Sequence, residues 1–415
     1  MSNDPILIVG AGIIGLVLGQ ALKKRNIPFK IYERDPSLAS RPQGWAITLH
    51  WALQYLPDLL PAETLNAIED GQVDPEVAKN DTGNFLFLDL STGDVKWRIP
   101  PNKRWRVNRE KLRRALLLGI EENVEWGVRV EDVHVADEAA GAEARLIYSR
   151  RSKPDTTADG KSGIKEESAP GKLIIGTEGA RSTIRQFLCP TTYKNTRLPA
   201  RFTGVIAPMT AEEIAPLRAM DPLLFKGCHP ETGVFLWFSM LEPPTEDNGG
   251  KYKVQIGLSW MVHSPADEVP ASNADRLANM KRRAEGFVPF LYDTVQRIPE
   301  DTEVVEVTLA DWECEASVWD NRGGKVTLAG DAAHAMTMYR GEACNHGILD
   351  AVHLVEAIEK IHAGGNSKDA IDEYEAEMRK RGQAAVLLSR QACLDAHDWE
   401  SLNENSAILK KRQLD

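Results

Sequence analysis

The segment PILIVGAGIIGLVLGQALKKRNIPFKIYERD, residues 5–35, carries the strongest signal of fold in the chain. Ile6–Val9 form a short apolar run, which is typical of a buried strand in a parallel sheet. Three glycines in GxGxxG spacing follow, a helix is expected to run to about residue 25, and residues 29–33 supply a second strand that ends in an acid. This order of strand, glycine turn, helix, strand and acid predicts a unit that binds a dinucleotide.

Each glycine of this unit has its own predicted role, and so does the acid. Gly10 permits the tight turn, Gly12 lets the backbone approach a pyrophosphate, and Gly15 lets the helix lie close to the strand. The helix N-terminus offers free N–H groups and a positive dipole to phosphate. Glu33 is expected to bind ribose hydroxyls, and it disfavours NADP at this site because its carboxylate would repel a 2′-phosphate.

The composition predicts a folded protein without a nucleic-acid surface. The chain has 415 residues, 42% of them hydrophobic, and a net charge of −11. This size predicts two domains, or one large α/β domain with a second sheet. The charge argues against binding along a phosphate backbone. Five cysteines without CxxC spacing predict neither a disulfide framework nor a metal site. The N-terminus does not resemble a signal peptide, and no apolar run has the length of a membrane span, so the expected location is cytoplasmic.

Two further segments specify which dinucleotide is expected. In KLIIGTEGARSTIRQFL, residues 172–188, the acid–glycine pair that begins at Glu178 follows an apolar strand. In VTLAGDAAHAMTMYRGEACNHGILDA, residues 326–351, Asp331 stands at the end of another strand, and a helix is expected from residue 342 or 343 to residues 364–365. A carboxylate suits ribityl hydroxyls, and a helix N-terminus suits a ring oxygen that gains negative charge on reduction. A flavin has both features.

With these motifs in this order, the chain resembles the single-component FAD-dependent aromatic hydroxylases, which are class A flavoprotein monooxygenases similar to p-hydroxybenzoate hydroxylase. The resemblance covers nearly the whole chain. It implies FAD bound without a covalent bond, and it places four further FAD contacts on matching positions, namely Gly44, Arg109, Gly341 and Ala343. The chain departs from the family pattern at Glu178, Ala335, Met338, Glu342 and Ala343, and also at His50 and Trp51.

The fold class that we predict is α/β, with a Rossmann-like FAD-binding domain, an inserted and mostly antiparallel β-sheet domain for the substrate, and C-terminal helices. Apolar and aromatic segments separated by turn-rich sequences indicate the inserted sheet. The expected FAD-binding domain takes residues 1–72, 100–195 and 310–415, and the expected substrate domain takes residues 73–99 and 196–309. Residues 152–171 lack periodicity and are expected to form an extended hairpin tip.

The resemblance implies a monooxygenase. NAD(P)H, as NADPH or NADH, would reduce FAD, and a flavin C4a-hydroperoxide would transfer one oxygen atom from O2 to an electron-rich aromatic or polycyclic substrate of the secondary-metabolite kind. Three alternatives remain open: an alkene epoxidase with the same flavin chemistry, a flavin dehydrogenase or reductase that does not activate oxygen, and a flavin-binding regulator without turnover. The sequence gives neither the identity of the substrate nor the oligomeric state.

Three residues are candidates for the substrate side of the site. Tyr339 and Arg340 occupy the tip of the loop that is expected to border the flavin ring. Arg340 is a candidate catalytic residue that could bind a carboxylate, polarise a carbonyl or donate a proton, and its alternative role is a salt bridge with Glu342. Tyr339 and His50 are candidates for the substrate pocket, and His50 has the alternative of a structural histidine. His334 is expected to be structural.

Overall fold

A five-stranded parallel sheet forms the centre of one half of the molecule. The computed structural model describes residues 4–40, 44–136, 144–150, 165–314 and 319–414. The strand order is β19-β11-β1-β2-β7, and every neighbouring pair is parallel. The strands are β1 (Ile6–Val9), β2 (Phe29–Glu33), β7 (Val124–Trp126), β11 (Leu173–Gly176) and β19 (Val326–Leu328). The sheet therefore joins segments that lie far apart in the sequence.

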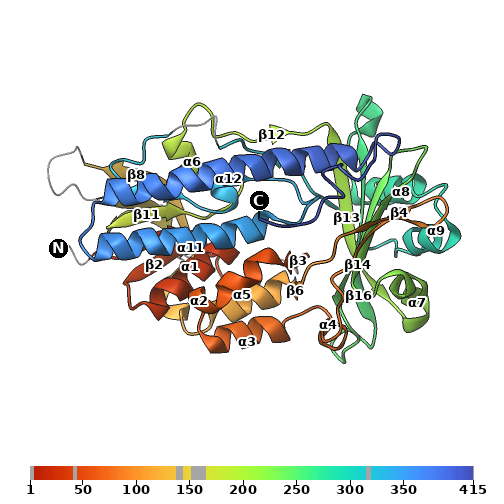
Figure 1. Ribbon diagram of the computed structural model, residues 1–415, viewed down its shortest axis with the longest axis horizontal. Coiled ribbons are helices and arrows are strands. Elements are labelled where there is room, and N and C mark those ends of the chain that lie inside the picture. Colours follow the sequence, from red (N-terminus) through yellow and green to blue (C-terminus); the bar gives the residue numbers. More distant parts are fainter. Residues whose placement is uncertain (1–3, 41–43, 137–143, 151–164, 315–318, 415) are drawn as a thin grey trace, which may run out of the picture.

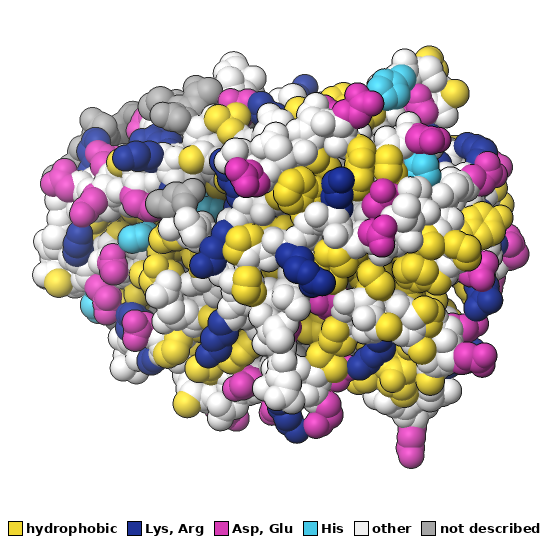
Figure 2. Space-filling view, turned by 45° about the vertical axis from the view of Figure 1, so that its right-hand side comes forward, with side chains coloured by type: hydrophobic (Ala, Val, Ile, Leu, Met, Phe, Trp, Pro, Cys, Tyr) yellow, Lys and Arg dark blue, Asp and Glu magenta, His cyan; other side chains and the backbone are white. Residues whose placement is uncertain are grey.

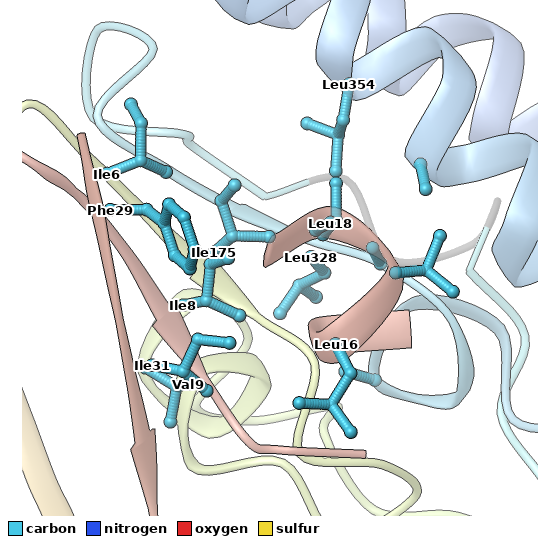
Figure 3. Packing of buried hydrophobic residues seen from close by; sticks show 14 of the residues in the cluster. Ile6, Ile8, Val9, Leu16, Leu18, Phe29, Ile31, Ile175, Leu328 and Leu354 are labelled. Atoms are coloured by element: carbon cyan, nitrogen blue, oxygen red, sulfur yellow. The ribbon is translucent and has the colours of Figure 1, made fainter. Parts of the chain in front are cut away.

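Helices cover this sheet and bury its apolar face. Figure 3 shows side chains of β1 packed near Leu16 and Leu18 of α1, with Ile175 of β11 and Leu354 of α11 close by, and these residues are buried. The helix α1 contacts α5 and α11, and α11 contacts α12. The helices of this half are α1 (Ile13–Lys24), α2 (Leu56–Leu59), α3 (Ala62–Asp70), α5 (Arg109–Leu117), α6 (Thr183–Leu188), α10 (Asp331–His334), α11 (Ala343–His362) and α12 (Ser367–Asp395), whereas Val77 of α4 (Pro75–Ala78) packs against the cluster of the other half.

A seven-stranded sheet forms the other half, in the order β17-β13-β16-β15-β14-β4-β5. All its pairs are antiparallel except β14 with β4. The strands are β4 (Phe85–Asp89), β5 (Val95–Ile99), β13 (Ala200–Met209), β14 (Leu224–Cys228), β15 (Phe235–Glu242), β16 (Tyr252–Met261) and β17 (Val305–Glu306). Figure 1 shows α7 (Ala211–Met220), α8 (Asn273–Arg283) and α9 (Pro289–Gln296) on the outer side of this sheet.

Alternation along the strands gives the seven-stranded sheet two different faces. Phe225 and Phe238 belong to the hydrophobic cluster that includes residues of α7, α8 and α9. On the opposite face of the same two strands, Leu224 of β14 and Phe235 of β15 belong to a second cluster, which also contains Tyr339. The second face is therefore directed toward the nucleotide-binding half, and α12 extends along both halves (Figure 1).

Three small sheets complete the fold. One pairs β3 (Ala46–Leu49) with β6 (Trp105–Asn108), and another pairs β12 (Thr196–Arg197) with β18 (Ala310–Asp311). In the third, the central strand β9 (Ala144–Arg150) pairs with β8 (Val128–Val135) on one side and with β10 (Lys165–Gly171) on the other. Short 3-10 helices lie at Leu38–Ser40, Trp51–Tyr55, Glu121–Asn123 and Pro265–Asp267.

The predicted α/β fold class and the predicted β1–α1–β2 unit are confirmed. The helix expected from residue 342 or 343 is also confirmed, since α11 begins at Ala343. The expected hairpin tip at 152–171 needs a correction, because residues 165–171 form β10 and pair with β9 over seven residues. The sequence of β10 does not alternate between apolar and polar residues, so its strand conformation depends on pairing with β9. Residues 152–164 lie outside the described part of the chain.

Charged side chains of both signs are distributed over the surface of the protein. Figure 2 shows that basic and acidic side chains are interspersed on the face that it presents, and that the basic residues do not gather into one patch there. Among the described residues, no helix is both long and apolar enough to cross a lipid bilayer.

Candidate active site

One cavity of about 870 Å³ lies between the parallel sheet and the seven-stranded sheet. This volume is at the upper end of the range for small-molecule sites. The carboxyl ends of four parallel strands reach its wall through Gly10, Glu33, Glu178 and Asp331. Ligands of open α/β sheets bind outside this edge. The opposite wall comes from the inner face of the seven-stranded sheet and includes Phe85, Phe202, Lys226, Phe235, Trp237 and Gln255.

The N-terminus of α1 faces this cavity at one end. Gly12 is its N-cap and no side chain caps the helix, while Gly12, Ile13 and Ile14 line the cavity. The free N–H groups of this turn therefore suit a phosphate. Gly10 has a φ of +106°, which favours glycine. A Cβ on Gly15 would lie 2.0 Å from the carbonyl oxygen of Gly10, so the third glycine serves helix packing, as predicted.

Glu33 and Glu178 line the cavity, and each carboxylate also accepts a hydrogen bond from a backbone N–H group. Glu33 Oε2 accepts a hydrogen bond from the N–H of Ala11 at 2.7 Å. Glu178 Oε1 accepts one from the N–H of Ile184 in α6 at 2.9 Å, whereas its Oε2 is buried and finds no hydrogen-bond partner in the described chain. Burial raises the pKa of the Glu178 carboxyl, against the effect of its backbone hydrogen bonds. The longer side chain at this position thus reaches α6.

The predicted flavin-ring residues gather at the N-terminus of α11. Gly341 and Ala343 line the cavity, and the side chain of the N-cap Glu342 does not cap the helix. Gly341 has a φ of +68°, and a Cβ there would meet no protein atom within 4 Å. Asp331 is exposed within the cavity, and Arg109 lines it as well. The carboxyl of Asp331 opens on the cavity but is surrounded by protein atoms, and this desolvation raises its pKa, while nearby His334 and Arg109 oppose the rise.

Gly44 lies behind this wall. A Cβ on Gly44 would lie 3.0 Å from Cδ of Arg109, so Gly44 provides room for that side chain. Its neighbours Trp45 and Ala46 line the cavity, whereas Gly44 is not among the lining residues. The structure therefore brings Gly44 to Arg109, and a direct contact with the flavin stays a prediction.

His50 is also placed outside the cavity wall. It is 3% exposed, its backbone N–H donates to Asn345 Oδ1 at 2.9 Å, and its ring Nε2 lies 3.4 Å from the carbonyl oxygen of Gly341. Burial, with a smaller contribution from Arg412, lowers the pKa of His50 to about 3. A neutral histidine that holds the backbone of the flavin loop matches the structural alternative for this residue.

Tyr339 and His334 differ in their relation to the cavity. Tyr339 lines it, and its hydroxyl donates to Ser259 Oγ at 2.7 Å. Ser259 Oγ lies 2.7 Å from Nε2 of His397. His334 is fully buried, with Nε2 2.6 Å from Asp350 Oδ2, and is not part of the wall. The expectation that His334 is structural is confirmed.

Arg340 lines the cavity, but its guanidinium is occupied by protein partners. Nε donates to Glu342 Oε2 at 2.5 Å, and the other nitrogens donate to the carbonyl oxygens of Ala407 at 2.5 Å and Lys411 at 3.1 Å. The guanidinium thus ties the flavin loop to the segment 407–412. These contacts favour the salt-bridge alternative over a catalytic role.

We expect Arg340→Ala to keep FAD but to lose both turnover and thermal stability. The change leaves the Glu342 carboxylate buried without its cation, and breaking such a pair costs about 3 to 5 kcal/mol. Thermal unfolding, bound-flavin absorbance and turnover should be measured together, with exposed Arg322→Ala as the control. Unchanged stability with lost turnover would instead support a catalytic role.

Sequence reasoning missed the charged residues on the substrate side of the cavity. Lys226, Arg106 and Arg412 are buried and line the wall. The sequence did indicate the position of Lys226, because side chains alternate along β14 and Lys226 therefore lies on the same face as Leu224 and Cys228. A lysine at an inward position of an apolar strand indicates a site rather than a core.

The residues of this cavity fit a flavin dinucleotide. Two helix N-termini without side-chain caps open on one cavity, and a carboxylate stands near each of them. Gly179 has a φ of +87°, and a Cβ built on it, as on Gly341, would meet no protein atom within 4 Å. The space beside both glycines is therefore open to a ligand. The fold and this cavity define an α/β oxidoreductase of the FAD-binding class.

Comparison with known proteins gives the family. A family model described as an FAD binding domain matches residues 150–389. A probable FAD-dependent monooxygenase of Arthroderma benhamiae is 40% identical over 98% of this chain and 95% of the relative. The FAD-dependent monooxygenase dbaB of Emericella nidulans is 44% identical over 84% of this chain and 85% of the relative. The chain therefore belongs to the FAD-dependent monooxygenases, as the motifs predicted.

Solved structures support the same fold at low sequence identity. A putative FAD-containing monooxygenase from Photorhabdus luminescens superimposes with a TM-score of 0.75 at 20% identity, covering 96% of this chain and 100% of that one. The 2,6-dihydroxypyridine-3-hydroxylase from Arthrobacter nicotinovorans has a TM-score of 0.73 at 17% identity, covering 100% and 98%.

Proposed function

We propose that this FAD-dependent monooxygenase uses NAD(P)H and O2 to hydroxylate an electron-rich aromatic or polycyclic small molecule. The observation that carries the proposal is the shared cavity. The face of the seven-stranded sheet that bears Phe85, Phe202, Phe235 and Trp237 lines the same space as the flavin-binding residues. Aromatic walls suit a planar substrate. A cytoplasmic location, which the five free cysteines support, belongs to the same proposal.

The protein supplies binding, orientation and shielding from water, while bound FAD supplies the activation of O2. The N-terminus of α1 would hold the diphosphate of FAD, and Asp331 would hold its ribityl chain. The N-terminus of α11 would stabilise negative charge on the flavin ring. Trp45 extends the aromatic wall next to Gly44, and a Cβ on Gly204 of β13 would lie 2.1 Å from its ring. This close packing fixes the orientation of Trp45 over the sheet.

Turnover tests the proposal directly. The purified protein, reconstituted with FAD, should consume NADPH and O2 faster when an aromatic or polycyclic substrate is present. The product should carry one added oxygen atom, read by mass spectrometry in 18O2. An oxygen added across an isolated alkene would establish epoxidation instead. Flavin reduction without substrate-dependent oxygen incorporation, across a broad panel of aromatic compounds, would contradict hydroxylation.

Asp331→Ala should give folded protein with little bound FAD. Asp331 lines the cavity, and no hydrogen bond of its carboxylate to another described side chain is found, so its removal takes away a ligand contact rather than a structural one. Visible absorbance of the purified variant measures the flavin content, with exposed Asp320→Ala as the control. A full flavin spectrum in Asp331→Ala would refute this assignment.

A further inference from the structure

Gln255 places an unpaired hydrogen-bond donor in the wall of the cavity. It lies on β16, is fully buried and lines the cavity. Its Oε1 accepts a hydrogen bond from the backbone N–H of Ala46 at 3.2 Å, whereas its Nε2 is buried and finds no hydrogen-bond partner in the described chain. Most buried polar atoms have a partner, and a buried donor without one costs free energy. The unpaired Nε2 therefore calls for a ligand.

The contact with Ala46 fixes which end of this amide is unpaired. The partner atom at Ala46 is a backbone N–H group, so exchanging Oε1 and Nε2 would put two donors against each other. Oε1 is therefore the atom that faces Ala46, and Nε2 is the atom without a partner. Because the unpaired group is a donor, its ligand has to supply an acceptor.

The neighbours of Gln255 in the sheet cannot supply that acceptor. The residues paired with it are Ile206 on β13 and Ser239 on β15. The side chain of Ile206 has no polar atom. Ser239 Oγ accepts from Nε and Nη2 of Arg106 at 3.2 and 2.8 Å and donates to the carbonyl oxygen of Met240 at 2.9 Å, so both its lone pairs and its proton are used. The cavity is then the side from which an acceptor can reach Nε2.

The wall next to this donor is aromatic. Gly257 lies two residues farther along β16 than Gln255 and is paired with Gly204 of β13. A Cβ on Gly204 would lie 2.1 Å from the ring of Trp45, and a Cβ on Gly257 would lie 2.2 Å from the ring of Phe202. Both rings therefore lie close to the backbone of the sheet, and both line the cavity. An aromatic ligand that packs against them would lie beside the amide of Gln255.

We propose that Gln255 is a specificity-determining residue, whose Nε2 donates a hydrogen bond to a carbonyl oxygen of the aromatic substrate. The inference rests on the proposed function and narrows its substrate class to aromatic compounds that carry a ketone, aldehyde or quinone oxygen. A substrate hydroxyl fits less well, because its own proton needs an acceptor and the nearby Ser239 Oγ and Thr48 Oγ1 already accept from Arg106. A compound of the same shape without the oxygen leaves Nε2 unpaired and binds more weakly.

Ligand binding to the oxidised holoenzyme without NADPH tests this proposal. Isothermal titration calorimetry should compare uncharged aromatic ketones with deoxygenated partners of similar shape, namely 1-tetralone with tetralin, 2-acetonaphthone with 2-ethylnaphthalene, and 9-fluorenone with fluorene. We expect at least one ketone to bind the wild type about 5- to 50-fold more tightly than its partner. In Gln255→Met, which removes the donor, this preference should disappear.

Gln255→Glu separates donation to the substrate from support of Ala46. The new carboxylate keeps an acceptor for the N–H of Ala46 but puts a second acceptor where Nε2 stands. At a pH of about 8, where a carboxyl is ionised, it should therefore lose the preference for the ketone as Gln255→Met does. If Gln255 served only to hold Ala46, Gln255→Glu would keep the wild-type preference, and that result would overturn the proposal.

Two controls keep the test decisive. Gln391→Met changes an exposed glutamine of α12, outside the cavity wall, and should leave the preference intact. Bound-flavin absorbance of both Gln255 variants should equal that of the wild type, and a loss of flavin from both would show that Nε2 serves the cofactor instead of the substrate. Equal affinity of the wild type for both members of every pair would also overturn the proposal. Because no oxygen chemistry is required, absence of turnover would contradict the proposed function without affecting this result.

Discussion

Gly15→Ala is expected to abolish FAD binding and most of the yield of folded protein. The added Cβ would lie 2.0 Å from the carbonyl oxygen of Gly10 and 2.7 Å from Oγ1 of Thr177. The first contact is with backbone, so no side-chain rotation relieves it. The hydroxyl of Thr177 also donates to the carbonyl oxygens of Val9 and Gly10, which fixes both sides of the turn. The helix α1 must move away from β1, at a cost of about 3 kcal/mol or more.

Soluble yield, circular dichroism and bound-flavin absorbance measure this effect, and Gly12→Ala is the matched control. A Cβ on Gly12 would lie 3.7 Å from the carbonyl oxygen of Thr177, which is an ordinary contact, but Gly12 lines the cavity. Gly12→Ala should therefore fold normally and bind FAD more weakly. Normal folding and flavin content in Gly15→Ala would show that the helix tolerates the shift.

The nucleotide-binding unit that contains these two glycines could be predicted because its interactions are local in sequence. Its strands, turn and helix lie within residues 5–35, and their interactions are local in sequence. The bounds of β1 and β2 follow from that pattern alone. The helix N-terminus and the position of Glu33 follow as well, because short βαβ units allow few alternatives.

The substrate side could not be predicted in the same way. Arg340 was expected at the tip of the loop that borders the flavin, and it lines the cavity, yet its partners Ala407 and Lys411 come from a segment about 70 residues away. Lys226 faces the cavity because β14 pairs with β15 in one register, and a shift of one residue would put it on the opposite face. The register depends on the whole sheet, so pattern reasoning identified the strands but not their functional side chains.

A second large effect is expected for Asp350→Ala, at a site that the sequence did not single out. Asp350 is fully buried in α11, and Oδ2 accepts from the N–H of Gly330 at 2.7 Å and contacts Nε2 of His334 at 2.6 Å. Oδ1 accepts from Nη2 of Arg381 at 2.7 Å. The carboxylate thereby holds the turn that presents Asp331, and its loss leaves Arg381 without one buried partner. We expect a loss of about 3 to 5 kcal/mol of stability and a lower FAD content.

Urea unfolding of Asp350→Ala and Asp350→Asn measures the effect, with Asp293→Ala, in an exposed ion pair, as the control. Burial acts to raise the pKa of Asp350, but His334 and Arg381 outweigh it and hold that pKa below its ordinary value. The ionised group therefore stabilises the fold above the pKa of the unfolded chain, about 4, and this contribution fades as the pH falls below that value. The stability gap between wild type and Asp350→Asn should be large at pH 7 and shrink below pH of about 4. A gap that stays constant with pH would mean that packing, rather than the charge of Asp350, holds the turn.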